Sequence, residues 1–355
     1  MKLAIDTTPL YVTKAGTARY VAGLLGGLTQ LSVPGVEIQK VAWEVSNFER
    51  GQPARILKTL FRDLVWAKLL APLRLKRLGS QVLHSTGSRY IRPPQGVRNV
   101  VTIHDLAPLR NPGRYRAWHR FRSIRELRAA HRADAITCIS EFTAREANEL
   151  LGIPLSKMRV VYNGCDYISL GGPPPGAKPE FVLPEEFCLF VGSLEPGKNL
   201  ALLREVYEQA EKSGIALPDL LIVGARWVGT GADDLPRKGW HFLGHVSDEN
   251  LIYLYRHARL FLFPTKYEGF GLPIAEAMAL GCPVVCGRVA SLPEVGGDAA
   301  VYAELNPVDF LKQTASLLAD PIRHRETVAA GLAQAAKFSW EKCAREMMAV
   351  YQSVL

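Results

Sequence analysis

A glycine-rich stretch at residues 267–279 reads Tyr-Glu-Gly-Phe-Gly-Leu-Pro-Ile-Ala-Glu-Ala-Met-Ala. The apolar run Leu260–Phe263 stands ahead of it and has the length of a buried strand. Pro273 suits the first turn of a helix, and Gly281 follows the last apolar turn, where helices commonly end. Pro283–Cys286 then has the pattern of a second strand. The stretch therefore predicts a strand, a glycine-rich loop, a short helix and a strand, as in a parallel sheet covered by helices.

The glycine-rich loop of this unit is expected to bind an anion. Its backbone N–H groups, with the positive end of a helix behind them, favour phosphate. Two carboxylates, Glu268 and Glu276, flank the loop. Carboxylates repel a phosphate unless they are engaged by hydroxyl groups. The combination predicts a sugar nucleotide as the ligand.

Strand-like and helix-like segments alternate along the 355 residues, which predicts two doubly wound α/β domains. The run Gly171–Pro179 breaks all periodicity and is the expected linker, so we place the domains at residues 1–170 and 180–339. The expected strands are 3–5, 37–42, 81–84, 99–103, 135–139, 158–161, 187–192, 219–223, 240–243, 260–263, 284–286 and 299–302. The expected helices include 19–30, 56–70, 115–131, 141–151, 307–318, 322–338 and 340–355.

The composition is that of a globular protein, with 48% hydrophobic and 22% charged residues. No run of 18 apolar residues is present, and Met1–Asp6 reaches an acidic residue too early for a secretory signal. The six cysteines stand singly, as expected of buried thiols in a reducing compartment. These features predict a cytoplasmic location.

Basic residues are concentrated in the first half of the chain. The net charge is +9, yet residues 50–132 hold 19 Lys or Arg against three acidic residues, so the remainder is net negative. The densest part, residues 54–79, has the pattern of a basic amphipathic helix, which can lie in a bilayer interface. Each Lys or Arg near anionic lipid adds about 1 kcal/mol. The residues expected on its apolar side are Leu57, Leu60, Phe61, Leu64, Trp66, Leu69 and Leu70.

This charge distribution predicts a peripheral protein at the inner face of the plasma membrane, docked on an anionic surface through the helix at 54–79. The alternative is a helix that packs on the domain sheet and exposes a solvated basic face. Nucleic acid is not an expected partner, because no helix-turn-helix, zinc knuckle or aromatic–arginine stacking pattern accompanies the charge.

Several motifs, in order along the chain, resemble those of retaining glycosyltransferases of family 4, which have the GT-B fold. The spacing of Glu268 and Glu276 around Gly-Phe-Gly-Leu-Pro is similar to the signature of that family. Phe190–Leu200 resembles its phosphate-binding segment, and Val161–Asp166 resembles the segment that closes its first domain. The motifs that match its N-terminal half are Ile5–Pro9, Gly16–Tyr20 and Ile103–Asp105.

The resemblance covers nearly the whole chain and implies a GT-B architecture, in which two Rossmann-like doubly wound domains face a cleft. It also implies that the C-terminal helix at 340–355 crosses back onto the first domain. The implied activity is that of a hexosyltransferase, which moves a hexose from a nucleotide sugar to a lipid-linked or surface-glycan acceptor with retention of configuration. Lipopolysaccharide, O-antigen or exopolysaccharide assembly is the expected setting.

GDP-mannose is the leading donor, because the Leu-Glu-Pro-x-Lys-Asn and Ile-His-Asp contexts resemble those of mannosyl- and rhamnosyltransferases. UDP- and dTDP-sugars remain open. No Asp-x-Asp motif, which holds a metal in retaining transferases of the other common fold, occurs in the chain. Its absence fits the metal-independent mechanism that the resemblance implies. Neither a metal nor another cofactor is therefore expected beside the nucleotide sugar.

The resemblance assigns catalysis to Lys198, Glu268 and His104. Lys198 is implied to stabilise the negative charge that grows on the leaving phosphate. Glu268 is implied to bond hydroxyls of the transferred sugar or to stabilise charge on its ring, and His104 to lie against that sugar. Family members commonly carry an arginine at the place of Ser193 or of Gly197, and this chain has neither. One cation of the expected phosphate clamp is therefore missing.

The remaining expected contacts hold the donor. The resemblance implies that Glu276 bonds the ribose hydroxyls, and Val246 is expected to contact the base through its backbone. Arg19 would supply charge from the opposite domain, and Gly16 would let the chain approach the diphosphate. The expected donor-binding residues are Gly16, Arg19, Lys198, Val246, Gly269, Phe270, Gly271, Leu272 and Glu276.

Two other functions remain open. One is a sugar-nucleotide epimerase of similar fold, which the basic helix and the spacing of Glu268 and Glu276 fit less well. The other is a non-catalytic homologue, docked on membranes or bound to carbohydrate, whose phosphate clamp has decayed. The absence of an arginine at Ser193 and at Gly197 keeps that second alternative open. Turnover of a donor separates this alternative from a transferase, because of the two only a transferase has it.

Overall fold

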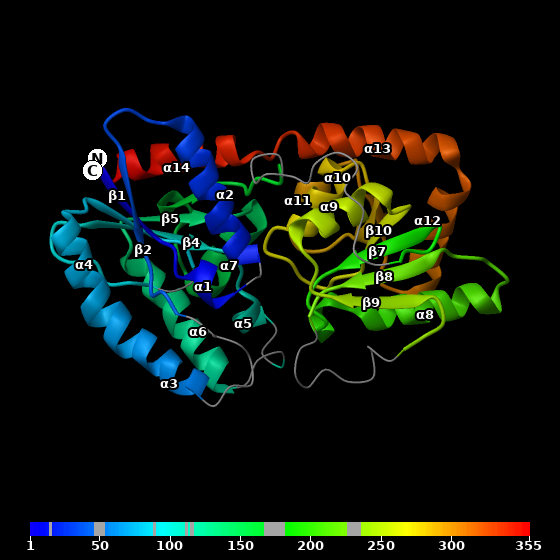
Figure 1. The fold of residues 1–355 in the computed structure, drawn as a ribbon, viewed down its shortest axis with the longest axis horizontal. Coiled ribbons are helices and arrows are strands. Elements are labelled where there is room, and N and C mark those ends of the chain that lie inside the picture. Colours follow the sequence, from blue (N-terminus) through cyan, green and yellow to red (C-terminus); the bar gives the residue numbers. More distant parts are fainter. Residues whose placement is uncertain are drawn as a thin grey trace. The chain divides into compact units, whose positions relative to one another are not determined.

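The computed structural model describes residues 1–13, 16–45, 54–87, 90–110, 113, 117–166, 182–225 and 236–355. The chain forms two compact units, one of residues 1–164 with 339–355 and the other of residues 165–338 (Figure 1). The predicted linker at 171–179 lies outside the described residues. No helix in the described ranges is long and apolar enough to cross a membrane.

The first unit contains a six-stranded parallel sheet in the order β2-β1-β3-β4-β5-β6. Each of its strands was predicted to within one residue at either end, because short apolar runs bounded by polar turns mark buried strands well. The strands are β1 (Lys2–Asp6), β2 (Glu37–Val41), β3 (Val82–Ser85), β4 (Arg98–Ile103), β5 (Ala135–Cys138) and β6 (Met158–Val160).

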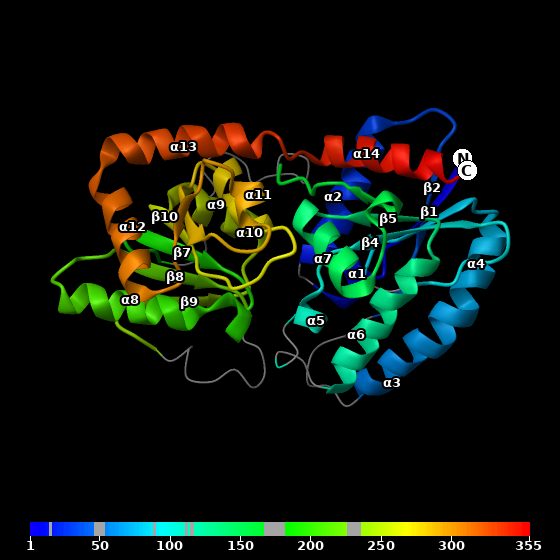
Figure 2. The ribbon, with the colours of Figure 1, turned by 180° about the vertical axis from the view of Figure 1, so that it is seen from behind.

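Helices cover both faces of this sheet, because successive strand residues point to opposite sides. α2 (Gly16–Leu31) and α14 (Trp340–Ser353) cover one face of the sheet (Figure 2). Leu3 and Ile5 of β1 pack in a core with these two helices. Ala4, between them, packs on the other face. The helical segments of that other face are α3 (Ala54–Phe61), η1 (Arg62–Leu70), α4 (Ala71–Leu78), α6 (Ala117–Ala129) and α7 (Glu141–Leu151). Short turns at α1 (Pro9–Val12) and α5 (Ala107–Arg110) follow β1 and β4.

Helices α2 and α14 approach each other closely because glycines of α2 leave room for Trp340. A Cβ atom on Gly23 would lie 2.1 Å from Trp340 Cε2, and one on Gly27 would lie 2.3 Å from the Trp340 carbonyl oxygen. Trp340 is 2% exposed and belongs to the core that α14 shares with the sheet. Residues 339–355 therefore complete the core of the first unit.

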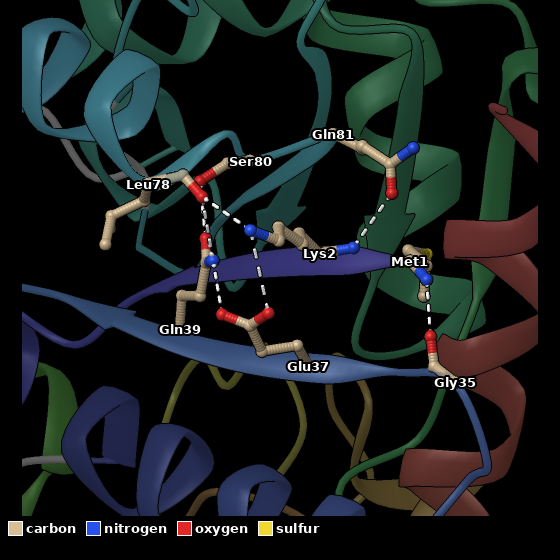
Figure 3. A network of polar contacts seen from close by, with 8 residues as sticks. All are labelled: Met1, Lys2, Gly35, Glu37, Gln39, Leu78, Ser80 and Gln81. Carbon is tan, nitrogen blue, oxygen red and sulfur yellow. Dashed lines mark hydrogen bonds and ion pairs between the residues drawn. The ribbon is translucent and has the colours of Figure 1, made fainter.

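A polar network closes the amino-terminal end of this sheet (Figure 3). Gln39 donates to Glu37 Oε1 at 2.8 Å and to the Leu78 carbonyl at 3.1 Å. Ser80 Oγ donates to Gln39 Oε1 at 2.6 Å. The network ties α4 to β2 and satisfies the buried polar atoms of Gln39 and Ser80. The opposite, carboxyl-terminal ends of the strands are left for the candidate site.

The segment predicted as one basic helix at 54–79 is formed by α3, η1 and α4 in succession. η1 is a π-helical segment, in which the Ala71 N–H donates to the Trp66 carbonyl, an i→i+5 bond. Trp66 is buried in the core, whereas Leu69 and Leu70 are exposed. The prediction that these three share one apolar side is therefore wrong, because the wider π-helical turn changes which positions face the sheet.

The second unit contains a six-stranded parallel sheet in the order β12-β11-β10-β7-β8-β9. β7, β8 and β9 extend in one direction from its middle, and β10, β11 and β12 extend in the other. The strand order therefore reverses between β7 and β10, and doubly wound sheets bind ligands beyond the carboxyl ends of strands at such a point. The strands are β7 (Phe187–Val191), β8 (Asp219–Val223), β9 (Trp240–Gly244), β10 (Leu260–Phe263), β11 (Val284–Gly287) and β12 (Val301–Ala303).

Helices also cover both faces of the second sheet. α8 (Leu200–Lys212) and α12 (Pro307–Ala319) pack into one core with β7, β8 and β10 (Figure 1). On the other face Tyr255 of α9 (Asp248–His257) packs on Phe261 of β10, with ring centroids 5.5 Å apart. The other helices are α10 (Leu272–Ala279), α11 (Leu292–Gly296) and α13 (Pro321–Ala335), of which α13 packs on α10 and α11. The predicted α/β class, with two doubly wound parallel sheets, is confirmed.

Candidate active site

Two loops meet where the strand order of the second unit reverses. The loop after β7 carries Lys198, and the loop after β10 carries Glu268. The backbone N–H of Lys266 donates to the Gly197 carbonyl at 2.9 Å, which joins the loops directly. The fold therefore places side by side two charged residues that are 70 positions apart in the chain.

Asn199 fixes the end of the first loop. Its φ of 59° is in the left-handed region, which asparagine tolerates better than most residues. Its side-chain Nδ2 donates to the Pro264 carbonyl at 3.1 Å, just after β10. The residue therefore turns the chain into α8 and also holds the loop of Lys198 against the loop of Glu268.

Lys198 and Glu268 form an ion pair, in which Nζ contacts Oε1 directly. Their side chains are 15% and 13% exposed, so both charges are largely shielded from water. Thr265 Oγ1 donates to the same Oε1 at 3.2 Å, and Nζ lies 5.4 Å from the ring centre of Phe263. A lysine ammonium has three N–H donors, so Nζ can hold the carboxylate and a phosphate oxygen together.

The glycine-rich loop continues from Glu268, and at Gly271 it has no room for a larger residue. Gly271 has a φ of 95°, and a Cβ atom there would lie 2.6 Å from Leu292 Cδ2. The Phe270 side chain is buried and packs edge-on against Phe338, with ring centroids 5.6 Å apart. Gly269–Gly271 is thus held rigidly at the start of α10, where the helix dipole favours an anion.

Glu276 is a buried carboxylate on α10. The Tyr255 hydroxyl of α9 donates to its Oε2 at 3.3 Å. Leu272, the first residue of α10, is also buried, so its side chain belongs to the core. Val246 follows β9 at the edge of the sheet, and β8 lies between β9 and β7. The structure therefore brings Lys198 and Glu268 together but places Val246 on a separate loop.

His104 directly follows β4 of the first unit. Its Nε2 lies 2.6 Å from the Thr86 carbonyl oxygen, and because a carbonyl only accepts, Nε2 carries the proton. Burial lowers the pKa of His104 below its ordinary value, an effect that outweighs the opposing hydrogen bond to Thr86 and the charge of Asp105. The ring is therefore neutral at neutral pH and has Nδ1 as its accepting nitrogen, which suits a sugar hydroxyl better than a phosphate.

A buried polar network supports His104 from beneath. The ring of Tyr20 contacts the His104 ring edge-on, with centroids 4.9 Å apart, and the Tyr20 hydroxyl lies 3.1 Å from Thr102 Oγ1. Thr102 Oγ1 is 2.7 Å from His84 Nε2, and His84 Nδ1 is 2.7 Å from the hydroxyl of Tyr351 on α14. Burial, and secondarily the nearby His104, lowers the pKa of His84 to about 3, so this network stays uncharged.

Gly16 and Arg19 also belong to the first unit. The helix was predicted to begin at Arg19, but α2 begins three positions earlier. Gly16 is therefore the first residue of α2 and does not lie in a loop before it. A Cβ atom on Gly16 would meet no described atom within 4 Å, so packing among the described residues does not require a glycine there. Arg19 lies in the first turn of α2 and is partly exposed.

Comparison with known proteins identifies the chain. The family model described as glycosyl transferases group 1 matches residues 185–320, and the model of glycosyltransferase family 4 matches residues 16–167. The O-antigen chain mannosyltransferase B of Escherichia coli is 34% identical over 99% of this chain and 100% of that protein. The chain belongs to glycosyltransferase family 4. The serotype-specific mannosyltransferase WbdA of Escherichia coli is 32% identical to the transferase over 70% of this chain, a match that spans 32% of WbdA.

Solved structures show the fold of the transferase. Sucrose-phosphate synthase from Thermosynechococcus elongatus superimposes with a TM-score of 0.79 at 19% identity, over 100% of this chain and 99% of that one. WaaG, a glycosyltransferase involved in lipopolysaccharide biosynthesis, superimposes with a TM-score of 0.67 at 13% identity, over 98% and 99% of the two chains. The predicted family, GT-B fold and hexosyltransferase class are therefore confirmed.

Four residues that support the site of the transferase were not predicted. Thr265 bonds Glu268, and Ser291 Oγ donates to the Glu268 carbonyl at 2.9 Å. Tyr255 bonds Glu276, and the Thr86 carbonyl orients His104. Thr265 and Thr86 stand just after strands, which is a signal that sequence could have provided. Tyr255 lies within a helix, and nothing local in the sequence indicates its partner.

Proposed function

We propose that the transferase moves mannose from GDP-mannose to a lipid-linked or surface-glycan acceptor in O-antigen or lipopolysaccharide assembly, with retention of configuration and without a metal ion. The pairing of Lys198 with Glu268 at the point of strand reversal is the observation that carries this proposal. The mannosyltransferase names of the two Escherichia coli relatives support the choice of sugar and setting.

The proposed reaction breaks the bond between the anomeric carbon and the diphosphate and forms one to the acceptor oxygen on the same face. The acceptor hydroxyl gives its proton to the departing phosphate oxygen, so no protein base is needed. Lys198 stabilises the negative charge on that phosphate, which grows towards the transition state. Glu268 accepts hydrogen bonds from sugar hydroxyls and stabilises the positive charge on the ring. The pair is thus matched to both developing charges.

The remaining residues hold the donor in the proposed complex. Glu276 accepts hydrogen bonds from the two ribose hydroxyls, for which a carboxylate is well suited. The backbone at Gly269–Gly271 faces the diphosphate, and Val246 contacts the base. His104 accepts a hydrogen bond from the sugar through Nδ1, and Gly16 and Arg19 approach the diphosphate from the first unit.

Nucleotide release from a donor panel tests this assignment. Among GDP-mannose, UDP-glucose, UDP-GlcNAc and dTDP-rhamnose, we expect release from GDP-mannose alone, at the same rate with and without EDTA. Metal independence is expected because no Asp-x-Asp motif is present and Lys198 already supplies a cation at the phosphate. Release from another donor would overturn the choice of mannose, and loss of release in EDTA would overturn the metal-free mechanism. If no donor is hydrolysed without acceptor, calorimetric binding of the same four donors makes the same distinction.

We further propose that α3, η1 and α4 dock the transferase on the inner face of the plasma membrane. Exposed leucines and cationic side chains alternate along this surface, as they do in helices that lie in a bilayer interface. The exposed leucines are Leu57, Leu60, Leu64, Leu69, Leu70 and Leu73.

Charge reversal on this surface tests the docking. The triple variant Arg74→Glu, Lys76→Glu and Arg77→Glu is expected to lose binding to vesicles that contain phosphatidylglycerol by about 100-fold or more, since each cation near anionic lipid contributes about 1 kcal/mol. Binding is measured by co-sedimentation over a range of lipid concentrations. Unchanged binding would show that this surface does not dock.

A further inference from the structure

A large hollow lies between η1 and α6, on the same side of the first unit as the proposed docking surface. Its volume is about 950 Å³, and its walls include Asp63, Ala67 and Lys68 of η1 and Phe121 and Ile124 of α6. Two carboxylates, Asp63 and Glu126, contribute to the lining. The six cationic residues that line this η1–α6 groove are Lys68, Arg92, Arg120, Arg125, Arg128 and Arg132.

The groove is built around an internal ion-pair cluster that joins its two walls. Asp63 Oδ1 accepts from Arg62 Nε at 3.1 Å, and Asp63 Oδ2 accepts from Arg122 Nη1 of α6 at 3.1 Å. All three side chains are little exposed. Asp63 is therefore already compensated by two arginines that do not line the groove, which weakens its repulsion of an anion there.

Three cations of the groove are left to a ligand. Within the described ranges, Lys68, Arg125 and Arg128 make no ion pair with a carboxylate, and their side chains are exposed. Arg125 and Arg128 are three positions apart on α6 and so lie on one face. Lys68 faces them because positions 63, 67 and 68 share one side of a π-helical turn. Like charges gathered in this way repel one another, and an anion with more than one charge relieves that repulsion.

Aromatic side chains stand beside these cations on α6. Phe121 lines the groove and is 61% exposed, and Trp118 is 62% exposed with its ring centre 6.4 Å from that of Phe121. Leu64 of η1 is also exposed. Large exposed aromatic and leucine side chains next to basic residues are typical of surfaces that enter a bilayer interface. The ligand that fits both features has an anionic head and an apolar tail.

We propose that the η1–α6 groove binds the phosphate headgroup of a bilayer lipid that carries more than one negative charge, with Trp118 and Phe121 entering the bilayer beside it. This rests on the proposed docking of the first unit and adds a specific lipid site to it. A phosphate monoester carries a charge of about −1.5 to −2 at neutral pH, whereas a diester carries about −1. The groove therefore favours a lipid phosphomonoester or diphosphate over a lipid phosphodiester.

Vesicles of matched total charge separate this site from diffuse attraction. One set contains phosphatidylcholine with phosphatidic acid, and the other contains phosphatidylcholine with enough phosphatidylglycerol to give the same charge. We expect the wild-type protein to bind the phosphatidic acid vesicles about tenfold more tightly. The double variant Arg125→Gln and Arg128→Gln is expected to lose that preference, while Arg145→Gln and Arg159→Gln, which remove the same charge from exposed positions outside the groove, keep it.

The outcomes distinguish the groove from the docking surface. If both double variants weaken binding to the two lipids equally, the specific site is wrong and the docking proposal stands. If the wild-type protein binds neither kind of vesicle, the docking proposal fails and the lipid site fails with it. Calorimetry with inorganic pyrophosphate tests a soluble ligand. If the wild-type protein binds pyrophosphate tightly, the double variant Arg125→Gln and Arg128→Gln does not, and the wild-type protein shows no preference between the two kinds of vesicle, the groove binds a soluble phosphate and the lipid site is wrong.

Tryptophan fluorescence reports the aromatic contact independently. Trp43, Trp66, Trp240 and Trp340 are buried, and Trp227 lies outside the described residues, so the measurement is made in a Trp227→Phe background. In that background a blue shift on addition of phosphatidic acid vesicles is expected to come from Trp118. The shift should disappear in Trp118→Phe, whose tighter binding to phosphatidic acid should largely remain because phenylalanine keeps the apolar contact. A shift that persists in Trp118→Phe would show that α6 does not enter the bilayer.

Discussion

Lys198→Ala is expected to lower the turnover of the nucleotide sugar by about 10²–10³-fold, the usual effect of removing one preorganised group that stabilises developing charge. The loss has two physical causes. The leaving phosphate no longer meets a cation, and Glu268, which Lys198 now neutralises, becomes an uncompensated charge beside an anionic ligand. Steady-state kinetics with the preferred donor, with kcat and KM reported separately, measure the effect.

The matched control is Lys266→Ala. Lys266 stands in the loop that contacts the Lys198 loop, but its side chain is exposed and it contacts Gly197 through its backbone N–H, so turnover is expected to stay within about twofold. The double variant Lys198→Ala with Glu268→Gln should bind the donor better than Lys198→Ala alone, since it removes the unpaired carboxylate. Equal activity of Lys198→Ala and the wild-type enzyme would remove Lys198 from the mechanism.

Trp340→Ala is expected to destabilise the first unit by about 3–5 kcal/mol, the range for truncating a large buried aromatic residue. The indole fills the space that Gly23 and Gly27 leave on α2, and its loss leaves a cavity between α2 and α14 that neither helix backbone can easily close. Urea unfolding followed by far-UV circular dichroism measures the change. The two units need not unfold together, so the transition that shifts in the variant is assigned to the first unit.

Trp118→Ala is the control for that prediction. It removes the same side chain from an exposed position of the same unit, and a change within about 0.5 kcal/mol is expected. If Trp340→Ala changes the free energy of unfolding by as little as Trp118→Ala does, the contact between α2 and α14 contributes little to stability. The pair also separates the two roles of tryptophan in this unit, since only Trp118 is expected to affect vesicle binding.

The sequence predicted individual elements well where one local signal dominates. Helix α7 has the predicted bounds, because Ser140 caps its first turn and Gly152 ends it in the left-handed region. β8 and β10 also have the predicted bounds, since each is a short apolar run. The helix at 54–79 was less well predicted, because the π-helical turns of η1 rotate Trp66 into the core and Leu69 out of it. Helical periodicity assumes a constant turn and cannot detect that change.

The candidate site was predictable as a set of motifs and not as an arrangement. Lys198 and Glu268 were singled out separately, but their contact depends on β7 and β10 being neighbours, which strand order determines and local sequence does not. Supporting contacts such as the one between Tyr255 and Glu276 join different elements and leave no pattern along the chain. The catalytic and donor-binding roles of all the predicted site residues stay predictions.

The return of residues 339–355 to the first unit also determines the order in which the protein can mature on the ribosome. Translation proceeds from the amino end, and domains generally fold as they emerge. Residues 165–338 form one contiguous unit and can fold as soon as they have been synthesised. The first unit, although translated earlier, has only α2 on the face of Leu3 and Ile5 until α14 arrives, so part of that core stays uncovered. A nascent chain paused before residue 339 therefore presents an apolar surface to chaperones, and the half of the enzyme that is made first is finished last.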